Sequence, residues 1–356
     1  MKVRKILVLG ASYGSLLGVK LAAAGHAVTL VCLPAEAKLI NERGAIVRMP
    51  VKGREGLVEV RSRDLPGRLD ACGTAGLDPS RYDLVGLAMQ EPQYGSPGVR
   101  ELLSAVGSLR VPCLSIMNMP PLPYLRRLPG VDAEACRAAY TDPTVWDAFD
   151  PRSITLCSPD PQAFRPPEEP VNVLQVRLPT NFKAARFEGD GPTAMLRELE
   201  AGIDAARFDA GAGERIELPV KLRVHDSVFV PLAKWAMLLA GNYRCVEPDT
   251  VRPIRDAVHG DPQASRAVYD WVAALCVKLG AAPSDLVPFE KYAAAAQSLG
   301  SPSSAARALA AGARHIERVD KLVQLVAARQ GMRSDLVDET VRRVDGWLDR
   351  NRRAAA

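Results

Sequence analysis

The first part of the chain alternates between apolar runs and a segment with helical periodicity. Residues 6–9 form an apolar run that leads into a glycine turn, and an alanine-rich periodic segment follows over residues 16–24. Gly25 ends that segment, and a second apolar run begins at Ala27. Neither run alternates with polar residues, which is typical of strands buried on both faces of a parallel sheet. Residues 5–33 therefore predict a strand–helix–strand unit.

The glycine turn is the first candidate for chemistry. Where a strand turns sharply into a helix, residues without Cβ let backbone N–H groups approach a pyrophosphate, and the helix dipole favours its charge. Gly10, Ser12, Tyr13 and Gly14 form this candidate cofactor-binding turn, whereas Gly18 is better placed to pack the helix against the sheet. Ser12 stands where the usual fingerprint has its second glycine, and the turn is one residue short. A turn of some other α/β protein and a Gly-x-Ser-x-Gly nucleophile elbow are the alternatives; no Asp/His spacing favours the elbow.

The apolar pattern continues in the same style. Residues 82–89 and 111–117 predict two further buried strands, and residues 99–109 predict the amphipathic helix between them. Such an order predicts a doubly wound sheet, in which ligands bind outside the carboxyl ends of the strands. Gln90 and Asn118 stand at two of these ends and are candidate cofactor-binding residues.

The residue that ends the second strand usually separates the two nicotinamide cofactors. An acid there binds the ribose hydroxyls of NAD, and a nearby base binds the 2′-phosphate of NADP. Cys32 and Leu33 occupy this position, so neither signal is present. Lys38 and Arg43 are the bases that follow, but such residues on a surface helix seldom bind a phosphate.

Two segments interrupt this alternation. Residues 47–60 alternate loosely and contain two glycines, which predicts a hairpin. Residues 120–170 carry many prolines, which predict that no regular helix or central strand runs through them. A long irregular connection of this kind is usually functional or disordered, and its aromatic residues Tyr140, Trp146 and Phe149 favour an ordered lid or oligomer contact.

The last third of the chain has only helical periodicity. We expect helices over the following segments: 227–242, 264–279, 289–299, 304–330 and 336–350. The Pro-Ser-Ser sequence at 302–304 predicts a helix start with a hydroxyl for capping. The predicted fold is therefore α/β, a Rossmann-like doubly wound sheet in residues 1–218 followed by an all-α domain in residues 219–356.

Composition narrows the class of protein further. The chain has 356 residues, 47% of them hydrophobic, and a formal charge of +5 that is spread among acids, which does not favour nucleic acid as a partner. Seven cysteines without a C-x-x-C pair, and four scattered histidines, favour a reducing compartment over a disulfide framework or a metal site. The short apolar stretch near the start does not predict a signal peptide, and no run predicts a membrane helix. We expect a cytoplasmic protein.

Five stretches in order give the chain a family resemblance. GSLLGVKLAAAGHAVTLV, YDLVGLAM, LSIMNM, FVPLAKWAMLLAGN and PSSAARALAAG resemble the corresponding stretches of the ketopantoate reductases (2-dehydropantoate 2-reductases). The resemblance spans residues 5–118 and 225–331 and does not explain residues 120–170. It implies reduction of a branched 2-oxo acid with NADPH in pantothenate biosynthesis, and a homodimer formed through the helical domain.

The resemblance also implies roles for single residues. Lys234 matches the catalytic lysine, and Asn118, Asn242 and Ser304 match residues that bind substrate, Asn118 also contacting cofactor. Glu317 lies near the active-site glutamate but one residue late, and a solvated helix acid is the simpler interpretation of its register. The chemistry supports the lysine, because ketone reduction requires a proton donor that also stabilises the developing alkoxide.

Several departures separate the chain from that family. Gln90 replaces a lysine, Leu238 an asparagine and Ala308 an acid, and the base for the 2′-phosphate is absent. We therefore predict an NAD(P)H-dependent 2-oxo acid reductase in which Lys234 donates the proton, with neither ketopantoate nor NADP required by the residues. An opine-type dehydrogenase and a non-catalytic dinucleotide-binding protein are the alternatives.

Overall fold

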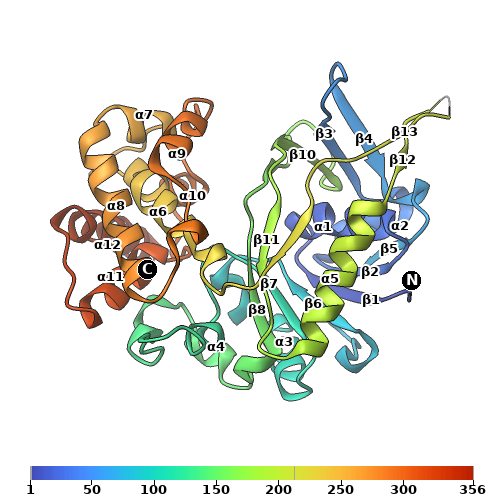
Figure 1. The fold of residues 1–356 in the computed structure, drawn as a ribbon, viewed down its shortest axis with the longest axis horizontal. Coiled ribbons are helices and arrows are strands. Elements are labelled where there is room, and N and C mark those ends of the chain that lie inside the picture. Colours follow the sequence, from blue (N-terminus) through green and yellow to red (C-terminus); the bar gives the residue numbers. More distant parts are fainter. Residues whose placement is uncertain (1, 212, 356) are drawn as a thin grey trace. The chain divides into compact units, whose positions relative to one another are not determined.

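The computed structural model describes residues 2–211 and 213–355 and divides into two compact units (Figure 1). Unit 1 contains the chain up to Met89 together with Ser96–Met117 and Val145–Asp226. Unit 2 contains Gln90–Gly95, Asn118–Thr144 and the chain from Ser227 onward. The boundary between sheet and helices therefore falls later than the predicted 218/219, because β14 (Leu222–His225) still belongs to the main sheet.

Unit 1 is built on an eight-stranded sheet with the order β14-β11-β8-β7-β6-β1-β2-β5 (Figure 1). The strands are β1 (Lys5–Leu9), β2 (Ala27–Val31), β5 (Arg68–Cys72), β6 (Leu84–Leu87), β7 (Cys113–Ile116), β8 (Ile154–Ser158), β11 (Phe182–Ala185) and β14. Neighbouring strands are parallel except β8 and β11. The chain moves from β1 to β2 on one side and reaches β6 on the other, so the sheet has a topological switch point at the carboxyl end of β1. The predicted Rossmann-like fold is confirmed.

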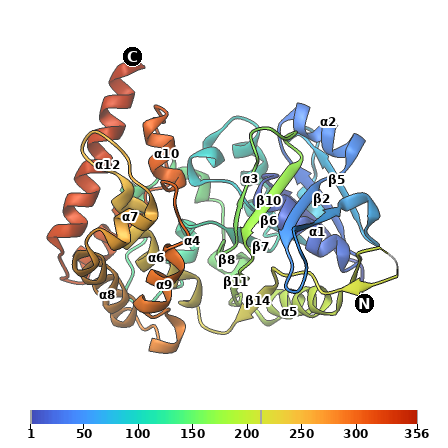
Figure 2. The ribbon, with the colours of Figure 1, turned by 90° about the horizontal axis from the view of Figure 1, so that it is seen from above.

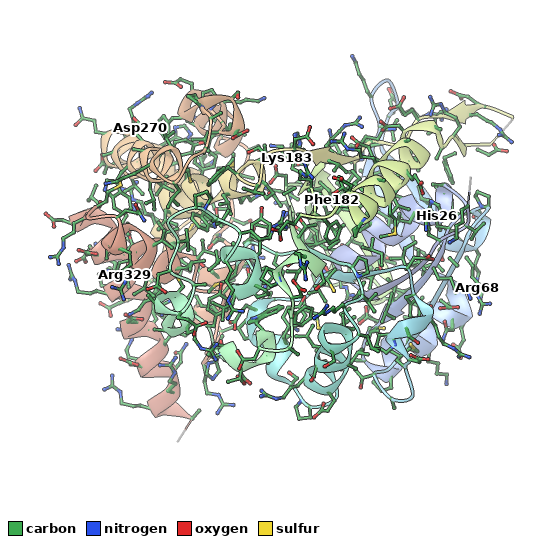
Figure 3. The ribbon with its side chains drawn as sticks, turned by 60° about the horizontal axis from the view of Figure 1, so that its bottom comes forward. His26, Arg68, Phe182, Lys183, Asp270 and Arg329 are labelled. Carbon is green, nitrogen blue, oxygen red and sulfur yellow. The ribbon has the colours of Figure 1, made fainter. Side chains whose placement is uncertain are left out.

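Helices complete the layers of unit 1. They are α1 (Tyr13–Ala23), α2 (Pro34–Arg43), α3 (Val99–Ser108) and α5 (Asp190–Ala205). Residues 6–9 of β1 are fully buried, as the unbroken apolar run predicts. On β11, Phe182 is buried, whereas its neighbour Lys183 points to the other face and pairs with Asp160 at 3.0 Å (Figure 3).

A second, four-stranded sheet has the order β4-β3-β10-β9, and Figure 2 shows its strand β10 from above. Its strands are β3 (Ile46–Pro50), β4 (Leu57–Arg61), β9 (Gln162–Phe164) and β10 (Val173–Leu178). Strands β3 and β4 form the predicted hairpin. Strand β10 lies parallel to β3 and antiparallel to β9, which joins segments that are distant in sequence. A two-stranded ribbon, β12 (Phe208–Asp209) with β13 (Arg215–Ile216), completes the unit.

The prediction that prolines exclude a central strand from residues 120–170 is wrong. Strand β8 lies inside the main sheet between β7 and β11, and all five of its residues are buried. The strand itself contains no proline, since Pro151 and Pro159 lie just outside its two ends. Prolines at these positions remove no hydrogen bond from the ladder.

Unit 2 is built from helices. They are α4 (Leu122–Leu125), α6 (Ala233–Met237), α7 (Ile254–His259), α8 (Pro262–Lys278), α9 (Phe289–Ala296), α10 (Ser304–Ala310), α11 (Val319–Arg329) and α12 (Asp335–Ala354). The segment predicted as one helix over 227–242 is a 3-10 turn, then α6, then a π-helical turn over Leu238–Asn242. The predicted helix over 304–330 is two helices, because Gly312 has a positive φ of 86° just after α10 and the chain leaves the helix there.

Candidate functional site

The glycine turn of unit 1 lies at the switch point of the sheet. Gly10 has a positive φ of 101°, and a Cβ atom there would lie 2.7 Å from the carbonyl oxygen of Ala88, at the end of β6. Its N–H donates to the carbonyl oxygen of Val31 at 2.8 Å. The backbone therefore passes between the ends of β2 and β6 in a space that only glycine fits.

Two further glycines let α1 lie close to the sheet. A Cβ atom on Gly14 would lie 2.9 Å from Cγ1 of Val8, and one on Gly18 would lie 2.9 Å from Cδ1 of Leu69. The predicted packing role of Gly18 is confirmed, and Gly14 has a packing role as well.

The remaining residues of the turn begin α1. Ser12 is the N-cap residue but its hydroxyl does not cap the helix. Tyr13 donates its hydroxyl to the carbonyl oxygen of Pro161 at 2.9 Å. The turn thus has two features that a pyrophosphate requires: a strand that ends at a glycine of positive φ and the N-terminus of an eleven-residue helix.

The end of β2 carries charges that the local sequence does not reveal. Glu36, in the first turn of α2, forms an ion pair with Arg165, which directly follows β9. Lys38 instead pairs with Glu42 at 3.9 Å, and Arg43 is the last residue of α2, at the far end from the strand. The two bases considered from sequence therefore do not supply the charge at this position, whereas Arg165, 129 residues away from Glu36, does.

The register of Glu317, in unit 2, indicated a solvated helix acid, and this interpretation is wrong. Glu317 lies between α10 and α11, where its Oε1 accepts from the backbone N–H of Glu91 at 3.3 Å. Its Oε2 accepts from Nδ2 of Asn118 at 3.4 Å. Tyr243 holds the backbone in place, since its hydroxyl donates to the carbonyl oxygen of Glu317 at 2.5 Å and accepts from N–H of Val319 at 3.0 Å.

Glu91 is the partner that sequence reasoning missed. Its side chain is 2% exposed, and its Oε1 accepts from N–H of Thr141 at 2.9 Å. Burial raises the pKa of Glu91 to about 7, and hydrogen bonds from Thr141 oppose this shift. Burial also raises the pKa of Glu317 to about 7, with the Glu91 carboxyl adding to the increase and Asn118 opposing it. The only sequence signal was an acid next to Gln90, at the end of a predicted strand.

The acceptors of this cluster are not all used. Within residues 2–211 and 213–355, Oε2 of Glu91 and Oδ1 of Asn118 are buried without a hydrogen-bond partner. Buried acceptors of this kind are costly unless a ligand or water supplies donors. The cluster therefore suits a ligand that brings N–H or O–H groups.

The other predicted residues of unit 2 lie just before the π-helical turn, at its end, or in the segment bonded to it. Lys234 is half-buried on α6, and Asn242 ends the π turn that follows. The carbonyl oxygen of Asn242 accepts from the hydroxyl of Ser303 at 2.7 Å, and Ser303 also caps α10 by accepting from N–H of Ala306. The predicted capping hydroxyl is thus Ser303, which leaves Ser304 exposed as the first residue of α10.

The structure therefore brings several predicted residues into one network in unit 2. Asn118 contacts Glu317 directly, and Glu317 and the Ser303–Ser304 pair are both tied to the turn at Asn242–Tyr243. Gln90 is exposed, and its backbone is bonded to Gln93: its N–H donates to Oε1 of Gln93 at 2.9 Å, and its carbonyl oxygen accepts from N–H of Gln93 at 3.0 Å. The cofactor-turn residues belong to unit 1.

The raised pKa values predict a pH-dependent stability for the acid pair. A carboxyl whose pKa is raised from 4.5 to about 7 stabilises the folded state fully at low pH, and this contribution is lost as the pH rises through 7. Glutamine at position 91 stays neutral, so the free energy of unfolding of Glu91→Gln should lack this pH dependence. Between pH 4.5 and pH 8 the native protein should lose about 2–3 kcal/mol more than Glu91→Gln does. Urea unfolding at the two pH values measures this difference. Exposed Glu55→Gln is the control, and an unchanged pH dependence in Glu91→Gln would contradict the assignment.

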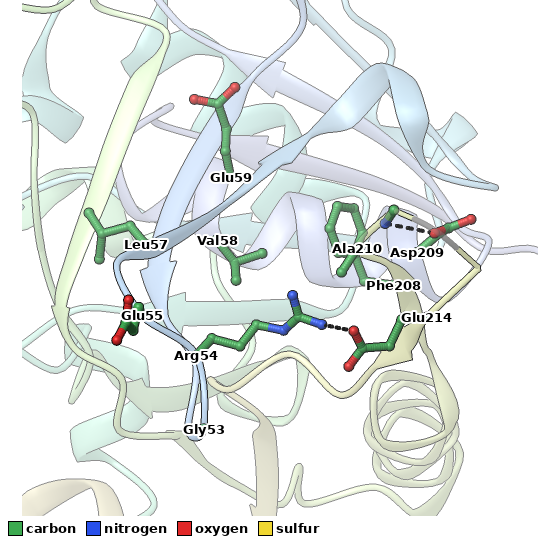
Figure 4. A pocket seen from close by; sticks show the side chains of 11 residues that line it. Gly53, Arg54, Glu55, Leu57, Val58, Glu59, Phe208, Asp209, Ala210 and Glu214 are labelled. Atoms are coloured by element: carbon green, nitrogen blue, oxygen red, sulfur yellow. Dashed lines mark hydrogen bonds and ion pairs between the residues drawn. The ribbon is translucent and has the colours of Figure 1, made fainter.

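A hollow of about 760 Å³ lies elsewhere in unit 1, between the β3–β4 hairpin and the β12–β13 ribbon (Figure 4). Charged side chains line much of it, and Arg54 pairs there with Glu214. It contains none of the predicted site residues. We therefore do not identify it with the site.

The described residues form neither a metal site nor a membrane-spanning helix. No group of three or more His, Cys, Asp or Glu side chains in residues 2–211 and 213–355 is arranged to hold a metal ion. Over the same residues, no helix has both the length and the apolar character needed to span a bilayer. The seven cysteines are free thiols.

Comparisons with known proteins locate the fold. No protein-family model matches the chain, and no curated protein sequence matches it. Among solved structures, 2-dehydropantoate 2-reductase from Methylococcus capsulatus is 14% identical, with a TM-score of 0.64 over 98% of this chain and 97% of that one. The 2-dehydropantoate 2-reductase from Geobacter metallireducens is 16% identical, with a TM-score of 0.61 over 96% and 99% of the two chains. A D-mandelate dehydrogenase with NADH and anilino(oxo)acetate is 16% identical, with a TM-score of 0.62 over 98% and 99%. The chain thus has the fold of the ketopantoate reductases at a large distance in sequence.

Proposed function

We propose that this protein is an NAD(P)H-dependent reductase of a 2-oxo acid. The observation that carries the proposal is the network in unit 2, where Glu317, Asn118 and the turn at Asn242 are held together although they are far apart in sequence. The glycine turn at the switch point of unit 1 supports a dinucleotide, and the fold is shared with reductases of this kind. Ketopantoate is one of the 2-oxo acids that this proposal includes as substrates.

The residues of unit 2 are suited to bind the substrate and to donate a proton to it. A bound nicotinamide dinucleotide supplies the hydride for the carbonyl carbon. Lys234 donates a proton to the carbonyl oxygen and stabilises the negative charge that develops there. Asn118 and Asn242 orient the reactants, and the exposed hydroxyl of Ser304 binds the carboxylate. Glu317, with a pKa of about 7, exchanges protons near neutral pH and acts as a second acid–base group.

Calorimetric titration with NADPH, NADH and their oxidised forms tests the first requirement of this proposal. Binding of a reduced form is the expected result, and it is followed by assays of cofactor oxidation with a panel of 2-oxo acids, ketopantoate first. Absence of binding for all four forms would overturn the proposal. Binding without turnover across the panel would instead favour a non-catalytic dinucleotide-binding protein.

One observation favours an opine-type dehydrogenase as the second candidate. The unused acceptors on Glu91 and Asn118 suit a substrate that carries N–H donors, such as an amino acid that condenses with a 2-oxo acid. An amino acid added to the 2-oxo acid assay would then accelerate cofactor oxidation. A rate that does not change with any added amino acid would exclude this candidate.

A further inference from the structure

We propose that Arg165 binds the 2′-phosphate of NADP(H), which makes NADPH the preferred cofactor; the inference rests on the function proposed above. The sequence shows no base at the end of the second strand, where this phosphate is usually bound. The structure brings one there from a different sheet.

The position follows from Cys32, the first residue after β2. Its N–H donates to the carbonyl oxygen of Cys72 at 3.0 Å, which continues the strand pairing to the carboxyl end of the sheet. Both charges of the Glu36–Arg165 pair act on its thiol: burial and the Glu36 carboxylate raise the pKa of Cys32 to about 12, and Arg165 opposes the increase. The pair therefore lies beside the residue that in dinucleotide-binding proteins faces the adenosine ribose.

Two contacts fix the segment that carries Arg165. Tyr13, at the start of α1, donates its hydroxyl to the carbonyl oxygen of Pro161, and Arg165 pairs with Glu36 at the start of α2. Between these contacts, β9 is held by its antiparallel pairing with β10. The segment is thus tied to the first turns of the two helices that follow β1 and β2, on the side of the sheet where ligands bind.

The exposure of the two partners decides which of them meets a ligand. The Glu36 side chain is 11% exposed, and its carboxylate already accepts from Arg165. The Arg165 side chain is 32% exposed, so the guanidinium is the charge on the outside of the pair. Its planar set of donors matches the oxygens of a phosphate, and a buried acid that holds it in place reduces the entropy lost on binding. A ribose hydroxyl would need the carboxylate to be the accessible partner.

Calorimetric titration of four proteins with NADPH and NADH tests the inference. They are the native protein, Arg165→Ala, Arg165→Lys and Arg54→Ala. Arg54 is a matched control, because it is a 30% exposed arginine of unit 1 that is ion-paired with Glu214 away from β2. Thermal unfolding of each variant checks that it is folded.

The native protein is expected to bind NADPH more tightly than NADH. Arg165→Ala should weaken NADPH binding by about 10- to 100-fold, the loss expected for charge-assisted hydrogen bonds, and leave NADH binding unchanged. Arg165→Lys should give an intermediate loss, and Arg54→Ala none. The NADPH affinity should also fall more steeply with salt than the NADH affinity.

Other results would overturn the inference in distinguishable ways. Equal weakening of both cofactors by Arg165→Ala would show that the arginine only supports the loop. Preference of the native protein for NADH would leave the proposed function standing and assign the position to Glu36 instead. Binding of neither cofactor would overturn the inference and the proposed function together.

Discussion

Replacing Lys234 by alanine is expected to lower the turnover number by about three powers of ten while the reduced cofactor still binds. The substitution removes the proton donor and the positive charge that stabilises the alkoxide. Both interactions are strongest in the transition state, where the negative charge on the oxygen develops. Steady-state kinetics of the native protein and the variant, on the 2-oxo acid found in the panel, measure the loss. Because the effect is on the chemical step, the decrease should appear in kcat rather than in KM alone.

The control for this substitution is Lys291→Ala. Lys291 is an exposed lysine on α9 of the same unit and has no predicted role. We expect it to keep full activity. Near-normal activity of Lys234→Ala would show that another group donates the proton, and Glu317 would then be the first to test.

Replacing Gly10 by alanine is expected to destabilise the protein by about 2–4 kcal/mol and to abolish dinucleotide binding. The new Cβ would lie 2.7 Å from the carbonyl oxygen of Ala88, so the ends of β1 and β6 must separate. The residue would also have to keep a φ of 101°, which alanine rarely adopts. Urea unfolding measures the stability, and calorimetric titration measures the binding.

Gly53→Ala separates these two causes. Gly53 has a φ of 81° in the β3–β4 hairpin, but a Cβ atom there would have nothing within 4 Å. It should therefore lose only about 1 kcal/mol, the strain of the backbone itself. A loss in Gly10→Ala no larger than that of Gly53→Ala would mean that the close approach of β1 and β6 is not essential.

Local hydrophobic patterns were sufficient to predict those helices and strands whose own residues carry a clear periodicity. The unbroken apolar run at residues 6–9 predicted a strand buried on both faces, because only a strand covered on both faces is apolar at every position. Helical periodicity located α8, α9 and α12 to within a few residues. Local rules were misleading where they were extended over too long a segment. The prolines of 120–170 exclude a regular element only at their own positions, and β8 lies between two of them.

Asn118 and Lys234 could be selected as candidates from sequence, because one follows a buried strand and the other lies in a stretch with a family resemblance. The environment of Glu317 could not be predicted. Its neighbours Asn118 and Glu91 are 199 and 226 residues away, and the pKa of its carboxyl depends on the burial that these contacts produce. Arg165 was hidden for the same reason, since a strand of the second sheet carries it to Glu36.

The sequence by itself determined the Rossmann-like sheet, the helical C-terminal region and the position of the glycine turn. These depend on periodicity and on residues close together in the chain, which act through local backbone geometry. Only the tertiary structure decided that Glu91 joins Glu317, that Arg165 stands at the end of β2, and that 154–158 is a central strand. Burial and charge pairing act through space, and the residues that create them here are separated by more than a hundred positions of the chain.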